Sequence, residues 1–261
     1  MERDEGRGRV ALVTGGASGI GRATAGVLAA RGWRVVISDI DAARCLEAAG
    51  TIGAEAVPFD VVDEAATEAA LADIEARLGP VDALVANAGL IQPGGRPEDL
   101  PLSEFDRIIA VNLRGVYVSC LKAGTRMAGR GRGAIVITGS VTASRTAPLH
   151  AYAPSKAAAV HMAACLAAEW GRSGVRVNAV SPGYVATPPL QAAIDRGQRD
   201  PRLLTEAAAL GRLVAAEEVG RGVAFLLSDD ASAITGINLP VDAGWLAGAH
   251  LSTYGGVRPA R

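Results

Sequence analysis

The chain has 261 residues, 49% of them hydrophobic, with 32 glycines and few aromatic residues. This length suits a single α/β domain whose core consists of small aliphatic side chains. A net charge of −1 argues against binding to nucleic acid or to an anionic membrane surface.

The N-terminal residues, the apolar runs and the cysteines give no indication of export, membrane insertion or metal binding. Residues 1–9 are dense in charge and contain no apolar stretch of the kind found in a signal peptide. No apolar run reaches the roughly 18 residues that a membrane-spanning helix needs. The three cysteines are far apart and match no metal-site spacing. We therefore expect a cytoplasmic protein without a metal ion.

Short apolar segments alternate with helical patterns along the chain. The expected strands are residues 10–14, 34–38, 56–59, 82–86, 134–138, 175–180 and 236–241. The expected helices are a first one ending at residue 30, then 41–49, 63–78, 103–127, one around and after residue 152, and 217–227. This alternation predicts a doubly wound parallel sheet in one domain, with a core at 9–244 and a C-terminal tail at 245–261.

The first strand leads into a glycine-rich turn, Gly15-Gly16-Ala17-Ser18-Gly19-Ile20-Gly21. Glycines let the backbone approach a pyrophosphate, whose charge the N-terminus of the next helix stabilises. The order Gly-x-x-x-Gly-x-Gly differs from the more common Gly-x-Gly-x-x-Gly. Because a tight turn needs glycine for its φ angles anyway, the turn alone is weak support for a dinucleotide site.

Acidic residues follow the second and third strands. Asp39 lies where a carboxylate accepts hydrogen bonds from the adenosine ribose hydroxyls, and it would repel a 2′-phosphate. The alternative is that Asp39 is only the N-cap of the next helix. Asp60 and Val61 lie where an acidic side chain would meet the adenine amino group. Asn112 stands inside an apolar helical segment that disfavours asparagine, so we expect it to serve a purpose there.

Tyr152 and Lys156 lie four positions apart, so a helix places them on one face. Pro154, between them, fits the first turn of a helix. The lysine charge and the helix N-terminus would lower the tyrosine pKa from its usual value of about 10. Ser140, at a strand end upstream, would point to the same spot and complete a site for a carbonyl or alcohol. The alternative is that the tyrosine and lysine form an ordinary solvated helix face.

Loops are expected to form the substrate pocket. Its walls would come from residues 90–97, 141–151 and 184–202, with 187–212 irregular or weakly helical and acting as a lid. His150 would either contact the substrate or face water, and Trp245 would lie near the mouth of the pocket.

From Val10 to Gly244 the chain resembles a classical short-chain dehydrogenase/reductase. The residues that carry the resemblance are Thr14 with Gly15 to Gly21, Asp60, Asn87-Ala88-Gly89, Asn112, Ser140, Tyr152 with Lys156, Asn178, and Pro182-Gly183 with Thr187. The resemblance implies a Rossmann-like sheet of about seven strands and a nicotinamide cofactor.

The same resemblance implies roles for particular residues. Tyr152 would be the acid/base, Ser140 would polarise the substrate oxygen, and Lys156 would hold the nicotinamide ribose and lower the tyrosine pKa. Asn112 would anchor a water molecule in a proton relay, and Thr187 with the backbone of Val185 would bind the carboxamide. The implied cofactor-binding residues are Gly15, Ser18, Gly19, Ile20, Gly21, Asp39, Asp60, Val61, Asn87, Ala88, Gly89, Tyr152, Lys156, Pro182, Gly183, Val185 and Thr187.

One interval departs from the family pattern. Ser140 and Tyr152 are one residue closer in the chain than is usual, which a deletion in the loop before the tyrosine would absorb. Ser144 is therefore a second candidate for the serine.

The sequence thus predicts an NAD-dependent oxidoreductase for a secondary alcohol, a polyol or the corresponding ketone. One alternative is an NADPH-dependent 3-oxoacyl-type ketoreductase, against which Asp39 argues. The other is a catalytically silent NAD-binding scaffold, which would not need Asn112, Ser140, Tyr152 and Lys156 together.

Two helical segments, 157–168 and 115–121, contain no formally charged residue. A helix that is apolar all round is normally buried all round. A second copy of the chain is the commonest cover, so we expect a homodimer that pairs again into a homotetramer.

Overall fold

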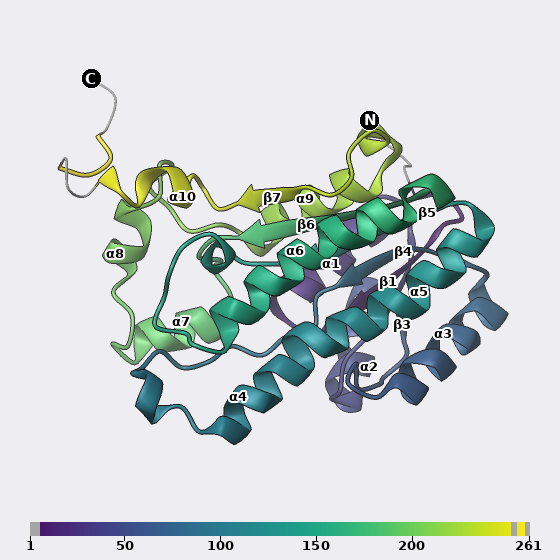
Figure 1. The fold of residues 1–261 in the computed structure, drawn as a ribbon, viewed down its shortest axis with the longest axis horizontal. Coiled ribbons are helices and arrows are strands. Elements are labelled where there is room, and N and C mark those ends of the chain that lie inside the picture. The colour runs from purple at the N-terminus through teal and green to yellow at the C-terminus, as the bar shows by residue number, and fades with distance from the viewer. Residues whose placement is uncertain (1–5, 252–254, 259–261) are drawn as a thin grey trace.

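The computed structural model describes residues 6–251 and 255–258, so that parts of the charged N-terminal segment and of the C-terminal tail lie outside the described residues. The described chain forms one parallel sheet with the strand order β3-β2-β1-β4-β5-β6-β7 (Figure 1). The strands are β1 (Val10–Thr14), β2 (Arg34–Ser38), β3 (Glu55–Ala56), β4 (Val81–Ala86), β5 (Gly133–Thr138), β6 (Val175–Pro182) and β7 (Asn238–Val241). The expected doubly wound fold is confirmed.

Helices cover both faces of the sheet. They are α1 (Gly19–Ala30), α2 (Ala42–Ile52), α3 (Glu64–Leu78), α4 (Leu102–Ile109), α5 (Val116–Arg130), α6 (Tyr152–Trp170), α7 (Pro188–Asp195), α8 (Pro201–Glu206), α9 (Ala216–Leu227) and α10 (Trp245–Gly248). One core lies between the sheet and α3, α5 and α6, and a second lies between the sheet and α1, α2 and α9. In Figure 1, α5 and α6 cross the front of the sheet.

Strand β1 shows why the central strands are apolar without interruption. Val10 and Leu12 belong to the core beneath α3, α5 and α6, whereas Ala11 and Val13 belong to the core beneath α1, α2 and α9. Successive side chains of a strand point to opposite faces, and here both faces are covered. An alternating polar pattern would therefore bury polar groups on one side.

Three expected elements differ from the structure. The third strand is only Glu55–Ala56, and Phe59 lies beyond it. The long helix expected at 103–127 is divided into α4, a π-helical segment Ala110–Gly115 and α5. The region 187–212 contains α7 and α8, each of which begins with proline in its first turn. Proline at that position favours helix initiation and outweighed the irregular pattern of this region.

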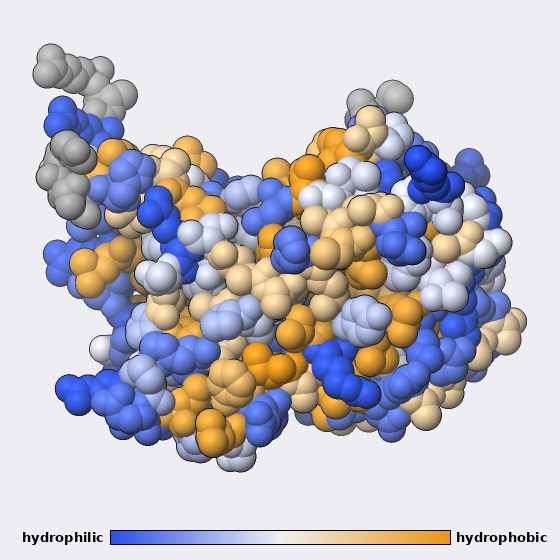
Figure 2. Space-filling model, viewed as in Figure 1, coloured by the Kyte–Doolittle hydropathy of each residue, from blue (hydrophilic) through white to orange (hydrophobic). Residues whose placement is uncertain are grey.

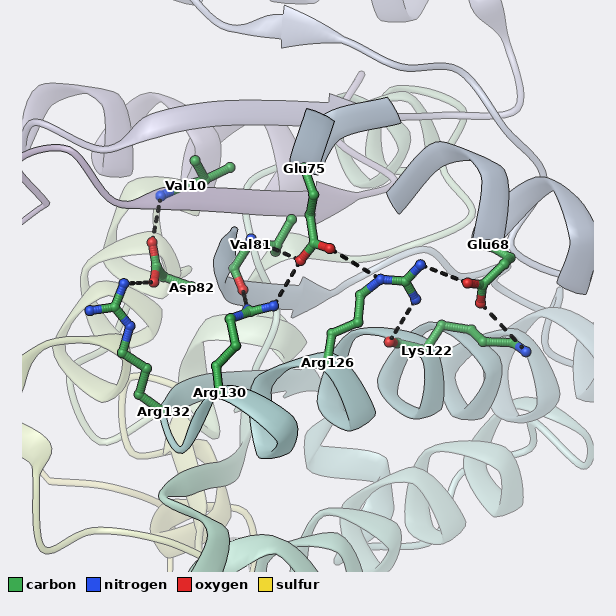
Figure 3. A network of polar contacts seen from close by, with 9 residues as sticks. All are labelled: Val10, Glu68, Glu75, Val81, Asp82, Lys122, Arg126, Arg130 and Arg132. Atoms are coloured by element: carbon green, nitrogen blue, oxygen red, sulfur yellow. Dashed lines mark hydrogen bonds and ion pairs between the residues drawn. The ribbon is translucent and has the colours of Figure 1, made fainter. Parts of the chain in front are cut away.

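A line of ion pairs joins α3 to α5 (Figure 3). Arg126 bonds Glu68 at 2.6 Å and Glu75 at 3.2 Å, and Arg130 bonds Glu75 at 2.9 Å. Arg130 also donates to the carbonyl of Val81 at the start of β4, at 2.7 Å. The arginines are four positions apart and therefore share one helix face. The charged residues of α5 thus lie on the side toward α3 and from Lys122 onward. The residues of α5 before Lys122 carry no charge.

The carboxyl ends of the strands meet at one edge of the sheet. The arrows of β6 and β7 point toward the region of α7, α8 and α10 (Figure 1). The chain runs outward from β1 through β2 to β3 on one side and then from β4 through β5 and β6 to β7 on the other. Neighbouring β1 and β4 therefore flank the switch point where doubly wound sheets bind ligands. Within the described residues, no helix is long and apolar enough to cross a membrane.

Candidate active site

The glycine turn after β1 forms a cradle with an open helix end. Gly15 has a φ of +63°, and a Cβ atom there would lie 2.8 Å from the Cα of Ala88. A Cβ on Gly21 would lie 2.1 Å from the carbonyl oxygen of Gly15. The N-cap residue Ser18 makes no side-chain cap, and the first turn of α1 contains no acidic residue. The first N–H groups of α1 are thus free to bind an anion, as the pyrophosphate of a nicotinamide dinucleotide requires.

Polar side chains tie the ends of β1, β4 and β5 together at the switch point. The Thr14 hydroxyl accepts hydrogen bonds from the backbone N–H groups of Asn87 and Ala88, at 3.1 and 3.2 Å. The Asn87 amide donates to the carbonyls of Thr14 and Gly15 and accepts from Thr138. This side chain therefore fixes the glycine turn against the neighbouring strands.

Asp39 lies at the end of β2, beside the glycine turn. One carboxylate oxygen accepts from the N–H of Ala17 at 3.3 Å, and the other accepts from the N–H of Asp41 at 3.3 Å. Asp41, and not Asp39, caps α2 by accepting from the N–H of Arg44. Among the residues that the structure describes, no arginine or lysine pairs with Asp39. The N-cap alternative for Asp39 is therefore wrong.

Asp60 and Val61 lie in the chain between β3 and α3, and not directly at the strand end as expected, because β3 ends at Ala56. Asp60 accepts from the N–H of Val62 at 2.9 Å, while Val61 is buried against Gly115 of the π-helical segment. Their contact with adenine stays a prediction.

Lys156 and Asn112 converge on Gly89. A Cβ atom on Gly89 would lie 3.3 Å from the Oδ1 of Asn112 and 3.4 Å from the Nζ of Lys156. The ammonium group of Lys156 donates to the carbonyl of Thr138 at 2.8 Å, and both polar side chains are buried. Burial lowers the pKa of Lys156 to about 8 because the charged form is poorly solvated.

Ser140 and Tyr152 come together from the end of β5 and the start of α6. The oxygen of Ser140 accepts from the N–H of Thr142 at 3.2 Å and from the Thr142 hydroxyl at 3.0 Å. The Ser140 proton is thus left for another acceptor. Ser140 is buried and lies close enough to the Tyr152 hydroxyl to influence its pKa, whereas Ser144 is exposed. The structure therefore pairs Ser140, not Ser144, with the tyrosine.

The expected direction of the Tyr152 pKa shift is wrong for this chain. Burial raises the pKa of Tyr152, and the nearby Ser140 side chain lowers it by less. The Nζ of Lys156 lies 5.8 Å from the centre of the tyrosine ring. A lysine that is itself poorly solvated at this separation does not outweigh the desolvation of the phenolate.

The residues after β6 reach the same edge of the sheet. Thr187 is at the N-cap position of α7, and its methyl group would lie 3.7 Å from a Cβ atom on Gly19. Val185 forms a parallel bridge with Val214, which holds this stretch in place. Gly183 packs tightly against Asp242, where a Cβ atom would approach to 2.8 Å, and Pro182 ends β6. Thr187 and the glycine turn are thus brought together.

Asn178 lies elsewhere. It is buried in β6, donates to the carbonyl of Ile234 at 2.9 Å and accepts from the N–H of Ile237 at 3.1 Å. Its role in the fold is to align the segment that enters β7.

A pocket of about 330 Å³ opens beyond the end of β6. Its walls are Tyr184, Gln198, Arg199, Asp200, Leu203, Leu204, Ala207, Trp245 and Ala249. Trp245 packs edge-on against Tyr184, with ring centres 5.6 Å apart, and lines this pocket. Its place at the mouth of the substrate pocket stays a prediction. Apart from Trp245, the wall residues that α8 and α10 contribute lie outside the expected ranges. Leu203 and Ala207 are four positions apart, as are Trp245 and Ala249, so each pair lies on one helix face. This spacing is the sequence pattern that could have indicated these two walls.

Two loop residues join the loops around the site. His150 bonds the carbonyl of Gly95 through Nε2 at 3.2 Å, so it links residues 90–97 to the loop before α6. Nothing in the sequence pattern singled out Gln92, whose buried side chain bonds the start of α6.

Comparison with known proteins identifies the family. Residues 15–246 match the family model described as enoyl-(acyl carrier protein) reductase. The chain is 40% identical over 250 residues to the cis-4-hydroxycyclohexanecarboxylate dehydrogenase of Sinomonas cyclohexanicum, which covers 92% of this chain and 97% of the relative. The chain belongs to the short-chain dehydrogenase/reductase family. As a short-chain dehydrogenase/reductase it is an oxidoreductase, and this family uses a nicotinamide cofactor, NAD or NADP.

A second curated relative and a solved structure match at similar levels of identity. The D-threitol dehydrogenase of Mycolicibacterium smegmatis is 37% identical over 244 residues, which are 91% of this chain and 93% of the relative. A solved structure from Brucella melitensis 16M, described as a ribose-5-phosphate isomerase, has a TM-score of 0.95 at 43% identity. It covers 99% of this chain and 100% of its own.

Proposed function

We propose that this short-chain dehydrogenase/reductase is an NAD-dependent dehydrogenase of a secondary alcohol or polyol, and reduces the corresponding ketone. The observation that carries the proposal is the meeting of Ser140 and Tyr152 with the Asn112–Lys156–Gly89 group at the edge of the sheet. A scaffold that only bound a dinucleotide would not need a buried lysine beside a tyrosine, because burial of the charge opposes folding.

In this proposal the chain's own residues handle the proton. Tyr152 gives its proton to the substrate oxygen in ketone reduction and takes it back in alcohol oxidation. Ser140, whose oxygen already accepts two hydrogen bonds from Thr142, donates its own proton to the substrate oxygen. Lys156 stabilises negative charge on the tyrosine oxygen. The chemistry that a bound nicotinamide supplies is hydride transfer.

The proposed cofactor preference depends on Asp39. Its carboxylate lies beside the glycine turn without a cationic partner among the described residues, so a 2′-phosphate would meet uncompensated negative charge. We expect NAD to be preferred over NADP by at least tenfold, which corresponds to about 1.4 kcal/mol. The alternative of an NADPH-dependent ketoreductase predicts the reverse order.

The cofactor experiment compares kcat/KM for NAD and NADP in the unmutated protein, in Asp39→Ala and in Asp41→Asn. Asp39→Ala should narrow the preference. Asp41→Asn, which keeps a helix-capping side chain, should leave it unchanged. Equal efficiency with both cofactors in the unmutated protein would contradict the NAD assignment.

The proposed substrate class comes from the pocket and the relatives. Tyr184, Leu203 and Trp245 provide apolar and aromatic walls, while Gln198 and Arg199 provide polar groups. Both dehydrogenases named above act on alcohols in which a ring or a short polyol carries the hydroxyl. We therefore expect turnover of cis-4-hydroxycyclohexanecarboxylate, D-threitol or a related secondary alcohol.

The substrate screen follows NADH formation by absorbance with these two alcohols and a panel of cyclic alcohols and sugars. A parallel assay without cofactor measures interconversion of ribose 5-phosphate and ribulose 5-phosphate. Alcohol oxidation without isomerisation supports the proposal. Isomerisation in the absence of NAD, with no alcohol oxidised, would overturn it.

A further inference from the structure

The start of α6 lacks the cap that other helices of this chain have. The first N–H groups of a helix have no partner inside the helix. In α2, α3 and α8 an aspartate at the N-cap accepts one of them. In α6 the N-cap residue is Ala151, whose side chain has no polar atom.

The N–H groups around this helix start can be followed one by one. Ala153 donates to the carbonyl of Leu149 at 2.9 Å, and Pro154 has no N–H. Ser155 donates to the carbonyl of Ala151 at 3.1 Å. The N–H groups of Ala151 and Tyr152 remain.

Gln92 accepts both of these N–H groups. Its Oε1 lies 2.8 Å from the nitrogen of Ala151 and 3.2 Å from the nitrogen of Tyr152. The side chain is 3% exposed, so it takes the place of an N-cap from a loop that is distant in the sequence. A buried helix start without this acceptor would hold two unsatisfied donors.

The loop that carries Gln92 is itself held at the site. Asn112 accepts from the N–H of Leu90 at 2.7 Å and donates to its carbonyl at 2.9 Å. Asn112 also donates to the hydroxyl of Ser155 at 3.3 Å, and Ser155 donates to the carbonyl of Tyr152 at 2.7 Å. A closed circuit of contacts thus holds Tyr152 by its N–H through Gln92 and by its carbonyl through Ser155.

We propose that Gln92 is a positioning residue for Tyr152. It determines where α6 begins, and therefore where the tyrosine hydroxyl lies relative to Ser140. The inference rests on the proposed acid/base role of Tyr152. A neutral amide suits this place, because an aspartate or glutamate would satisfy the same donors but add negative charge that disfavours the phenolate.

The experiment uses two variants of Gln92 that separate hydrogen bonding from charge. Gln92→Met has a similar length and no acceptor of this kind, so the helix start should shift. We expect kcat to fall about 10- to 100-fold, as small misplacements of a catalytic group do, with little change in the Kd for NADH. Gln92→Glu keeps the acceptor, so kcat for ketone reduction should stay close to that of the parent, while the pH profile of alcohol oxidation moves to higher pH.

A readout that needs no substrate is amide hydrogen exchange of residues 149–156. Gln92→Met should lose protection in this segment, and Gln92→Glu should keep it. Asp63→Ala is the matched control, because it removes the cap of α3 away from the site. It should lower thermal stability without changing kcat or the pH profile.

The outcomes distinguish the two proposals. If Tyr152→Phe is inactive while Gln92→Met keeps the kcat and the exchange protection of the parent, the positioning role is wrong and the proposed function stands. If Tyr152→Phe is as active as the parent, the acid/base role of Tyr152 is wrong, and with it the positioning role of Gln92. If Gln92→Met does not fold, an unshifted pH profile in Gln92→Glu overturns the charge argument on which the choice of glutamine rests.

Discussion

Two titratable residues of the site, the half-buried Tyr152 and the buried Lys156, have pKa values shifted toward their neutral forms. Burial raises the pKa of the tyrosine and lowers that of the lysine. At neutral pH the tyrosine therefore holds its proton, which is the form needed to protonate a ketone. The ionised form, which alcohol oxidation requires, increases only as the pH rises.

Substitution of Tyr152 by phenylalanine removes the hydroxyl and little else. NADH should still bind, while turnover should fall by ~10² to 10⁴, the usual contribution of general acid/base catalysis. In the unmutated protein, oxidation should rise with pH and reduction should not. Steady-state rates in both directions between pH 6 and pH 10 test this, and an active phenylalanine variant would assign the proton to another group.

The choice between the two serines is tested in the same way. Ser140 is buried against Tyr152, and Ser144 is exposed. Ser140→Ala should therefore lower kcat/KM far more than Ser144→Ala. The opposite order of the two variants in a single-substrate assay would move the assignment to Ser144.

Burial of the Lys156 ammonium group lowers the stability of the fold by an amount that depends on pH. Its pKa is about 8 in the folded chain and about 10.5 when unfolded, so between these values the unfolded state binds more protons. Stability should therefore rise with pH across this window, and below pH 8 the full penalty applies. Lys156→Met should be inactive yet more stable than the parent at pH 7, by roughly 1 to 3 kcal/mol.

Urea unfolding of both proteins at pH 7 and pH 10 measures this difference. The advantage of Lys156→Met should shrink at the higher pH. An advantage of equal size at both pH values would show that desolvation of the ammonium group is not its cause.

At the level of elements, one carboxylate connects the start of α9 to the region after β6. Glu218 accepts from the N–H of Ala215 at 2.8 Å and pairs with Arg212 through both oxygens. The segment between them carries Val214, which accepts from the N–H of Ala186 and donates to the carbonyl of Tyr184. This segment thereby supports the stretch that leads to Thr187.

Arg212 and the N–H of Ala215 lower the pKa of Glu218 to about 2. A carboxylate of this kind stabilises the fold above its unfolded pKa of 4.5, and its contribution is lost as the pH falls toward 2. Glu218→Gln should remove less than about 1 kcal/mol at pH 7, because the pair is exposed. It should also raise the KM for NAD by loosening residues 184–187.

Thermal melts at pH 7 and pH 3, together with NAD saturation curves, measure both effects. Glu104→Gln is the control, since Glu104 forms a similar exposed pair with Arg107 on α4. If the two variants change the KM for NAD equally, the Glu218 pair has no special link to the site.

At the level of the whole molecule, the outer face of α5 and α6 stands out. His161, Cys165 and Ala168 are exposed along α6, and Tyr117 is exposed on α5. Figure 2, seen from this side, shows apolar side chains gathered over the middle of the face. Small side chains permit close approach of helices, so we propose that a second copy of the chain covers this face as a homodimer, which pairs again into a tetramer.

Light scattering at micromolar concentration should report two or four chains. Cys165→Glu places a charge in the middle of the face and should lower the mass. Ala72→Glu, an equally exposed change on α3, should not. An active, soluble monomer in the unmutated protein would show that this face needs no cover.

Local patterns in the sequence determined most of the elements and the types of residue at the site. Apolar runs such as residues 10–14 predict central strands, because both faces of the sheet exclude water. The glycine turn and the spacing of Tyr152 and Lys156 depend only on neighbours within a few positions. The amino-acid sequence is sufficient to predict such short-range features, because each one is complete within a single turn or one face of a helix.

Only the tertiary structure decided how distant segments meet. Asn112 and Lys156 both approach Gly89. This approach depends on the order of β4 and β5 in the sheet and on the π-helical segment. The cap that Gln92 provides joins residues far apart in the chain, so no local pattern marks it. The direction of the Tyr152 pKa shift was missed for the same reason. Desolvation depends on everything packed around a group, whereas its charged neighbours on one helix can be read from their spacing.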